Sequence, residues 1–356
     1  MNFKVTLAPS GKAFDCAPGA RVLDAGLDAG LNLPHSCRAG NCSTCRARVL
    51  EGDVDHGVAH QAYLTSAQRD AGFTLLCCAK PLTDLVVEVE ELVLQLAKPR
   101  TMPCRIKRIR RPAEDVAILD LRLPLNENLM FAAGQYVEFL LGDGVTRSYS
   151  IANSPSPEGV IDLELHLRHY PGGLFTDRVF QSLKSGEMMK IRGPLGTFYL
   201  REESDAPVIL MATGTGVAPV MSILGYMARR GIRRKVSIYW GGRRTEDLYA
   251  DETLRQLAEQ VGARYVPVLS RSSSSDGWWG RTGYVQDAVL QDHPNLRGFQ
   301  VYACGSPAMV AAARDRLVAE GGLEEGSFFA DAFVSERERA HETANDNIQE
   351  CKGLLV

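Results

Sequence analysis

Four cysteines constrain this chain of 356 residues more than any other feature of its sequence. Cys37, Cys42 and Cys45 follow a C-x4-C-x2-C spacing, and Cys77 comes after a long intervening segment. This spacing is typical of the thiolate ligands of a [2Fe–2S] cluster, in which one loop supplies three ligands and a distant segment supplies the fourth. Structural zinc is the alternative, but it normally uses two close Cys or His pairs, and this sequence has one C-x2-C pair.

The loop from Ser36 to Cys45 resembles the cluster loop of plant-type ferredoxins, and Gly40 lets backbone N–H groups approach the sulfurs. Cys77 and Cys78 compete for the role of fourth ligand. In the ferredoxin pattern three residues separate the ligand from a proline, which favours Cys77 in Cys77-Cys78-Ala79-Lys80-Pro81. The resemblance implies a β-grasp ferredoxin domain over residues 1–97, with Cys37, Cys42, Cys45 and Cys77 as the metal ligands.

Composition limits the remaining classes. With 45% hydrophobic and 23% charged residues, the chain has a globular make-up, and its length predicts two or three domains. A net charge of -3 indicates neither nucleic-acid nor membrane binding. The opening residues alternate like a strand rather than like a signal peptide, and no apolar run reaches about 18 residues. We therefore expect a cytoplasmic protein whose cysteines outside the cluster stay reduced.

Changes of pattern divide the chain further. Residues 98–103 are predicted to be a linker, because two prolines interrupt a helix or a strand ladder there. Residues 104–202 alternate strand-like runs with glycine turns, which predicts an antiparallel β-barrel. Residues 203–335 alternate strands and helices, which predicts a parallel α/β sheet with its last strand at Gln300–Ala303. The fold class is therefore α+β multidomain, followed by a disordered tail over residues 336–356.

The barrel segment contains Arg147-Ser148-Tyr149-Ser150. It resembles the R-x-Y-S motif of the ferredoxin–NADP reductase superfamily, which holds FAD. The resemblance implies that Arg147 pairs with the flavin phosphates, that Tyr149 packs on the flavin ring, and that Ser150 hydrogen-bonds near flavin N5, with Ser148 between them. A guanidinium, an aromatic face and a hydroxyl suit these three tasks.

A second segment at a suitable distance contains His166, Arg168, Gly172, Gly173 and Thr176. It resembles the part of the same superfamily that leads into a helix at the FAD pyrophosphate, and we expect these five residues to bind the cofactor. Free N–H groups and the helix dipole at a glycine-rich helix start both favour phosphate. Two solvent-facing turns with a structural arginine are the alternative interpretation.

The segment Gly214-Thr215-Gly216-Val217-Ala218-Pro219 directly follows the apolar strand Val208–Ala212 and opens a helix. Its glycines permit close approach of a pyrophosphate, and Pro219 suits a first helical turn. In this position it resembles the nicotinamide-binding loop of the superfamily.

Two further features belong to the same resemblance. Cys304-Gly305-Ser306-Pro307 resembles the C-G-x-P element, whose thiol lies beside the nicotinamide; an ordinary buried cysteine is the alternative. Phe333 is a candidate lid over the flavin, with core packing as the alternative.

The order of the three domains over about residues 1–335 resembles the one-chain reductases of bacterial oxygenase systems. Arg147–Asn153 and the segment from Phe328 to Val334 also resemble the CDP-6-deoxy-glucoseen reductase group. The resemblance implies an oxidoreductase that passes electrons from NADH through FAD and the [2Fe–2S] cluster to a terminal oxygenase component, a Rieske or di-iron protein. A reductase for a CDP-6-deoxyhexose dehydrase is the first alternative. A redox sensor or a stand-alone diaphorase is the second.

Two charge patterns bear on the donor and on the partner. The segment from Gly241 to Tyr249 resembles that of NADH-using oxygenase reductases, which implies NADH as the donor. Glu246 and Asp247 disfavour a 2′-phosphate whereas Arg243 and Arg244 suit one, so the local charge does not decide between NADH and NADPH. Arg38, Arg46 and Arg48 surround the cysteine loop, and no acidic residue lies between Leu33 and Leu50. We expect these arginines to dock an acidic face of the partner; balance of the cluster charge is the alternative.

Overall fold

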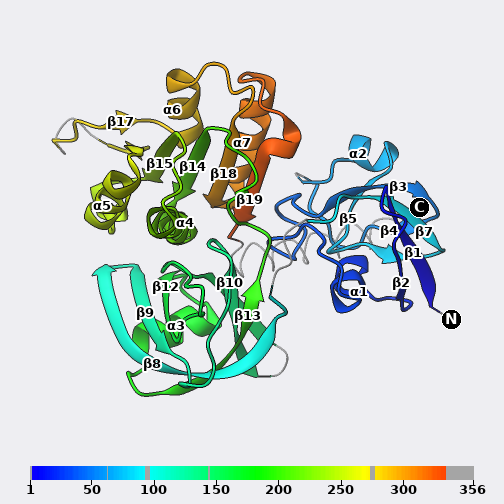
Figure 1. Ribbon diagram of the computed structural model, residues 1–356, viewed down its shortest axis with the longest axis horizontal. Coiled ribbons are helices and arrows are strands. Elements are labelled where there is room, and N and C mark those ends of the chain that lie inside the picture. The colour runs from blue at the N-terminus through cyan, green and yellow to red at the C-terminus, as the bar shows by residue number, and fades with distance from the viewer. Residues whose placement is uncertain (1, 62, 93–96, 143–144, 273–276, 334–356) are drawn as a thin grey trace, which may run out of the picture. The chain divides into compact units, whose positions relative to one another are not determined.

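The computed structural model describes residues 2–61, 63–92, 97–142, 145–272 and 277–333 (Figure 1). The chain divides into two compact units, Met1–Leu96 with Asp331–Val356, and Ala97–Ala330. The segment predicted to be a disordered tail lies outside the described residues. None of the helices that the structure describes is long and apolar enough to cross a membrane.

The N-terminal unit contains a five-stranded mixed sheet in the order β2-β1-β7-β3-β5. Strand β1 pairs in parallel with β7 and antiparallel with β2, while β3 pairs antiparallel with β5 and β7. The apolar side chains of α1 pack into the same core as those of β1, which gives the predicted β-grasp arrangement. The bounds are β1 Phe3–Ala8, β2 Ala13–Cys16, α1 Val22–Asp28, β3 Arg46–Glu51, β4 Val54–Asp55, α2 Ser66–Asp70, β5 Phe73–Leu75, β6 Lys80–Pro81 and β7 Leu85–Glu88.

The second unit begins with a six-stranded antiparallel sheet in the order β11-β10-β13-β8-β9-β12. A single bridge between Ile151 and Leu165 joins the two ends of this order, so the sheet curls into the predicted barrel. Phe139, Leu165 and Phe175 lie in its apolar core. The bounds are β8 Arg100–Ala113, β9 Val116–Arg122, β10 Tyr136–Gly142, β11 Val145–Ser150, β12 Asp162–Arg168, α3 Leu174–Gln181 and β13 Met188–Leu195.

The start of the barrel corrects the linker prediction. Residues Arg100–Pro103 belong to β8, where Pro103 pairs with Lys190 of β13. Pairing of β8 with β9 starts only at Arg105, so among the residues that the structure describes no strand pairs with the other side of β8 at Pro103. A proline, which has no N–H to donate, is tolerated in such an edge position. The prediction that the two prolines interrupt the ladder is therefore wrong for Arg100–Pro103.

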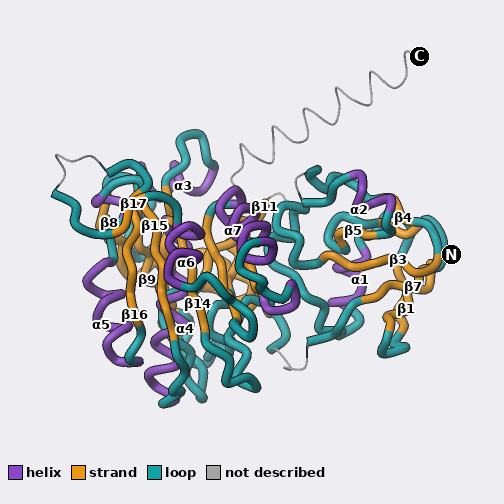
Figure 2. Tube along the Cα trace, turned by 90° about the horizontal axis from the view of Figure 1, so that it is seen from above, coloured by secondary structure: helices purple, strands orange, loops and turns teal. Residues whose placement is uncertain are grey.

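The rest of the unit contains a sheet in the order β17-β16-β15-β14-β18-β19, in which the strands from β17 to β18 pair in parallel. Helix α4 packs with α5 and helix α6 with α7, and both pairs flank the strands (Figure 2). Contrary to the sequence prediction, β18 is not the last strand. The bounds are β14 Val208–Thr213, α4 Val217–Arg230, β15 Val236–Gly242, α5 Asp251–Val261, β16 Arg264–Leu269, β17 Arg281–Thr282, α6 Val285–Asp292, β18 Gln300–Gly305, α7 Pro307–Ala319 and β19 Phe328–Ala332.

Side chains of α4 reach the segment that follows β11 in the barrel. The Ser222 hydroxyl donates to the carbonyl oxygen of Asn153 at 2.9 Å, and the Arg229 guanidinium donates to that of Pro155 at 2.7 Å. The barrel and the parallel sheet are thus joined by hydrogen bonds as well as by the chain.

Candidate functional site

The three closely spaced cysteines lie in the loop between α1 and β3, and Cys77 follows β5. The four thiols interact with one another, and the strongest effects on their pKa values come from two pairs, Cys37 with Cys42 and Cys45 with Cys77. A [2Fe–2S] cluster takes two protein ligands on each iron, so two pairs of thiols fit this group. In the described ranges, no three His, Cys, Asp or Glu side chains form a ligand set for a single metal ion.

The backbone of the loop points N–H groups at these sulfurs. The N–H groups of Ala39 and Asn41 lie 3.4 and 3.3 Å from Cys37 Sγ. Gly40 has a φ of 81°, and a Cβ there would lie 2.8 Å from Cys78 Sγ, so a larger residue would be both strained and crowded. These donors act in favour of the thiolate, which is the form that binds iron, while the hydrogen bond with Cys42 and burial raise the pKa of the Cys37 thiol overall.

Cys77 has the more suitable environment of the two adjacent cysteines. The hydrogen bond from Cys45 lowers the pKa of the Cys77 thiol to about 4, with further contributions from Cys78 and from the Gly40 N–H. The pKa of Cys78 is raised, first by its hydrogen bond to Cys77 and then by burial. The two sulfurs lie 3.7 Å apart. The contact with Cys45 supports the prediction that Cys77 is the ligand.

The R-x-Y-S residues lie on β11. Because side chains alternate along a strand, Arg147 and Tyr149 share one face, and Ser148 and Ser150 share the other. The Tyr149 ring centroid lies 6.0 Å from that of Phe139 and 5.7 Å from that of Phe175, and these rings fix its orientation. Burial raises the pKa of Tyr149, so its hydroxyl stays protonated.

Arg147 and Ser150 differ in exposure. Arg147 is partly exposed and donates to the carbonyl oxygen of Thr146 at 2.7 Å, whereas Ser150 is buried opposite Tyr136 in the β10–β11 ladder. An arginine at the surface and an aromatic ring held by its neighbours have the chemistry to bind a phosphate and a flat ring system. Their roles toward FAD stay predictions.

The glycines of the second flavin segment lie at the start of α3. Gly173 is the N-cap residue, and no side chain caps the helix from that position. The Asp177 carboxylate accepts from the Gly172 N–H at 3.0 Å, and the Thr176 hydroxyl donates to the Tyr170 carbonyl oxygen at 3.1 Å. These bonds order the turn in which a phosphate is predicted to bind.

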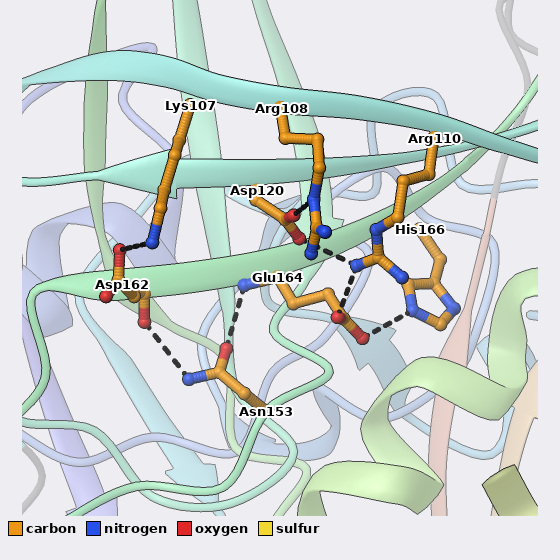
Figure 3. A network of polar contacts seen from close by, with 8 residues as sticks. All are labelled: Lys107, Arg108, Arg110, Asp120, Asn153, Asp162, Glu164 and His166. Carbon is orange, nitrogen blue, oxygen red and sulfur yellow. Dashed lines mark hydrogen bonds and ion pairs between the residues drawn. The ribbon is translucent and has the colours of Figure 1, made fainter.

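The side chains of His166 and Arg168 have protein partners instead. One ring nitrogen of the buried His166 lies 3.0 Å from a Glu164 oxygen (Figure 3). The other lies 2.8 Å from the Tyr249 hydroxyl. Arg168 donates to Asp115 and to Asp247, both at 2.6 Å. The sequence offered no signal for these contacts, because Tyr249 and Asp247 lie about 80 residues away.

The glycine loop after β14 forms a 3-10 turn, Gly214–Gly216, that includes Thr215 and leads into α4, with Pro219 in the first turn of the helix. A Cβ on Gly216 would overlap the carbonyl oxygen of Cys304, and one on Gly305 would overlap the Thr213 hydroxyl. The glycines are therefore needed for the close approach of this turn to the end of β18.

Strand order adds a reason to place a nucleotide here. From β14 the sheet continues in one direction through β15 and β16, and in the other through β18. The order thus reverses between β14 and β18, and ligands of open α/β sheets bind at the carboxyl ends of strands at such a point. Both Gly214 and Cys304 lie there, at the ends of β14 and β18.

Two aromatic residues beside this region were missed at the level of sequence. The Trp240 indole N–H donates to the Gly214 carbonyl oxygen at 3.0 Å, and the Tyr249 ring packs edge-on against Trp240. Trp240 was recognisable only as the end of a predicted strand. Phe333 lies directly after β19 and is partly buried, and its role as a lid stays a prediction.

A cysteine loop with two thiol pairs, an antiparallel barrel with the R-x-Y-S residues and a parallel sheet with a glycine loop define an iron–sulfur flavoprotein reductase. Three family models match the chain: the 2Fe-2S iron-sulfur cluster binding domain at residues 5–82, the oxidoreductase FAD-binding domain at 103–199, and the oxidoreductase NAD-binding domain at 210–315. The chain belongs to the family of oxidoreductases that combine these three domains, and its cofactors are a [2Fe–2S] cluster, FAD and a nicotinamide dinucleotide.

Individual relatives cover almost the whole chain. The CDP-6-deoxy-L-threo-D-glycero-4-hexulose-3-dehydrase reductase of Yersinia pseudotuberculosis is 39% identical over 94% of this chain and 99% of its own length. Reductase component 1 of the terephthalate 1,2-dioxygenase of Comamonas is 34% identical over 96% of this chain and 100% of its own length. The crystal structure of an Amycolatopsis cytochrome P450 reductase aligns with a TM-score of 0.74 at 34% identity, over 94% of this chain and 99% of that one.

Proposed function

We propose that this chain delivers electrons from NADH, through FAD and the [2Fe–2S] cluster, to a terminal oxygenase component that acts on an aromatic or related substrate. The observation that carries the proposal is the set of two thiol pairs, Cys37 with Cys42 and Cys45 with Cys77, in a chain that also has a flavin barrel and a nicotinamide sheet. FAD, when bound, accepts two electrons as a hydride and releases them one at a time, as a one-electron cluster requires.

The residues divide this work by position. The Gly214–Pro219 turn and Cys304 hold the nicotinamide end of the donor, at the carboxyl ends of β14 and β18. Arg147, Tyr149 and Ser150 on β11 hold FAD, and the turn at Gly172 and Gly173 receives its pyrophosphate. The domain boundaries that we propose are 1–97, 100–202 and 203–335, in which the barrel domain starts with β8 at Arg100 instead of at residue 104. We place the protein in the cytoplasm, where its thiols stay reduced.

Relatives support a protein partner of the oxygenase class. Besides the terephthalate dioxygenase component, a reductase component of a phenol 2-monooxygenase from Pseudomonas is 33% identical over 97% of this chain. The second candidate partner is a dehydrase that acts on a CDP-6-deoxyhexose, because the Yersinia reductase has the higher identity of 39%.

Reconstitution separates these functions. The purified chain, NADH and a purified Rieske or di-iron oxygenase encoded beside its gene should give hydroxylated product with matching consumption of NADH. The same mixture with a CDP-6-deoxyhexose dehydrase should stay inactive. Turnover with the dehydrase alone would move the second candidate to first place. Reduction of small acceptors without turnover of either partner would favour the sensor or diaphorase alternative.

A further inference from the structure

The carboxylate of Asp247 holds the loop that follows β15 in place through hydrogen bonds to the loop backbone and to the barrel. One Asp247 oxygen accepts from the backbone N–H groups of Arg243 at 2.7 Å and Arg244 at 3.1 Å. The other Asp247 oxygen accepts from the Arg168 guanidinium at 2.6 Å. Both oxygens of Asp247 are therefore engaged within the protein.

Arg168 belongs to the barrel, so this ion pair joins the barrel to the nucleotide-binding sheet. Its guanidinium also donates to Asp115, just before β9, at 2.6 Å. The side chains of Arg168 and Asp247 are 23% and 14% exposed, which is low enough to limit screening by water. A charged hydrogen bond in such a setting constrains position more firmly than an exposed surface pair.

A parallel contact from the same strand reaches the glycine loop. His166, two residues before Arg168 on β12, meets the Tyr249 hydroxyl at 2.8 Å. The Tyr249 ring packs against Trp240 with centroids 5.5 Å apart, and the Trp240 indole N–H donates to the Gly214 carbonyl oxygen. Strand β12 thus contacts the loop after β15 directly, and it reaches the Gly214 turn both through Tyr249 and Trp240 and through Arg168, whose Nη1 would lie 3.1 Å from a Cβ on Gly214.

The position of this loop indicates what it binds. In a βαβ nucleotide-binding unit, the end of the second strand meets the adenosine ribose, often through an acidic residue. Here β14, α4 and β15 form that unit, and the loop after β15 runs from Arg243 to Asp247, ending in the 3-10 turn Thr245–Asp247. Since both oxygens of Asp247 accept hydrogen bonds from the protein, the exposed residues of the loop are Arg243, Arg244, Thr245 and Glu246.

We propose that Arg168 is a positioning residue for the nicotinamide dinucleotide: through Asp247 it holds the Arg243–Asp247 loop in the conformation that binds the adenosine end. This inference rests on the proposed function in one respect, which is that NADH is the electron donor. It assigns to Arg168 a role in dinucleotide binding in place of the FAD-binding role expected from the sequence.

The test compares Arg168→Gln, Asp247→Asn and the double variant. Each is purified with FAD and measured for flavin content by absorbance, for the Kd of NAD⁺ by titration calorimetry, and for kcat and KM with NADH and ferricyanide. We expect full flavin content, a Kd and a KM raised about tenfold, and a kcat within about twofold of the parent at saturating NADH. The double variant should bind NAD⁺ with about the same Kd as the single variants, because each single substitution already removes the Arg168–Asp247 contact.

Two further variants keep the result interpretable. Arg122→Gln is the matched control, because Arg122 also pairs with a barrel carboxylate, Asp162 at 2.7 Å, away from the nucleotide loop; it should leave the Kd unchanged. Arg168→Lys keeps the charge and should fall between the parent and Arg168→Gln. If Arg168→Gln does not fold, Arg168→Lys replaces it as the variant in which the Kd of NAD⁺ is measured.

Two outcomes overturn the proposal. Loss of FAD from Arg168→Gln with an unchanged Kd for NAD⁺ after flavin is restored would assign Arg168 to the flavin. Full flavin content with an unchanged Kd would make the pair merely structural. Failure of the proposed function would appear separately, as a parent protein whose flavin is not bleached by NADH.

Discussion

The Cys304 thiol donates to the carbonyl oxygen of Gly216 at 2.8 Å and ties the end of β18 to the turn that opens α4. The thiol is fully buried, and its sulfur also lies 3.6 Å from the carbonyl oxygen of Met211. A residue predicted to lie beside the nicotinamide therefore also supports the loop predicted to bind the pyrophosphate.

Replacement of this thiol tests its place in hydride transfer. Cys304→Ala should slow flavin reduction by NADH about fivefold to tenfold, because the Gly216 carbonyl loses a donor and the turn loses a support. Cys304→Ser keeps a donor and should be less affected. The measurement is stopped-flow bleaching of the flavin. Cys104→Ala, at a buried cysteine of the barrel core, is the control and should lower stability only. Equal rates of flavin reduction in the parent and in Cys304→Ala would show that Cys304 has no role in hydride transfer.

Gly216→Ala probes the close approach itself. The new methyl would overlap the Cys304 carbonyl oxygen, so we expect a loss of about 1–3 kcal/mol in unfolding free energy and weakened binding of NAD⁺. Chemical denaturation and titration with NAD⁺ measure the two effects. Gly326→Ala, where nothing lies within 4 Å of the new Cβ, is the matched control. An alanine at Gly216 that binds NAD⁺ like the parent would disprove the need for glycine.

Variants of the adjacent Cys77 and Cys78 distinguish the entry of electrons at the flavin from their exit through the cluster. Cys77→Ser should lose the cluster, since its irons need all four thiolates. Bound FAD and its bleaching by NADH should survive, because the barrel belongs to a different compact unit. Iron content, visible absorbance and ferricyanide reduction report these effects. Cys78→Ser should keep the cluster and the delivery of electrons to the partner. The reverse pattern would show that Cys78 is the ligand.

Coenzyme preference follows from the exposed residues of the loop after β15. We expect kcat/KM for NADH to exceed that for NADPH by about tenfold, because the exposed Glu246 carboxylate disfavours a 2′-phosphate. Glu246→Gln should narrow the ratio. Steady-state kinetics with ferricyanide measures both values. A ratio that favours NADPH would show that Arg243 and Arg244, rather than Glu246, determine the coenzyme preference of the loop.

Docking of the partner should depend on salt and on the arginines of β3. Arg48 is exposed, and Arg46 lies over the Phe73 ring at 5.3 Å from its centroid. Raising salt from about 0.05 to 0.5 M should slow reduction of the partner, since surface charges are then screened. Arg46→Glu and Arg48→Glu should slow it at low salt. Lys4→Glu, an exposed charge on β1 of the same sheet, should not. Rates indifferent to salt and to both arginine variants would contradict electrostatic docking.

The sequence was most informative where the chemistry is local. The spacing of Cys37, Cys42 and Cys45 is contained in one loop, and the turn from Gly214 to Pro219 directly joins a strand to a helix, so both could be placed without knowing the rest of the fold. The same is true of the barrel and the parallel sheet, because alternation and glycine turns indicate them segment by segment.

Contacts between distant segments could not be read in the same way. Nothing near Arg168 or His166 indicates that their partners are Asp247 and Tyr249, so both were predicted as cofactor ligands by resemblance alone. The pairing of Arg100–Pro103 with β13 was missed for a related reason. A proline fits in a strand where that side of the strand has no partner, and the order of strands in the sheet, which the local sequence does not reveal, decides this.

The hydrogen bonds from Ser222 to Asn153 and from Arg229 to Pro155 have a thermodynamic consequence for the whole unit from Ala97 to Ala330. Segments joined by such contacts lose structure together rather than one after the other. A ligand that binds only the folded form stabilises everything that unfolds with its site. We therefore expect saturation with FAD to protect the nicotinamide-binding sheet against heat, although none of its strands belongs to the barrel.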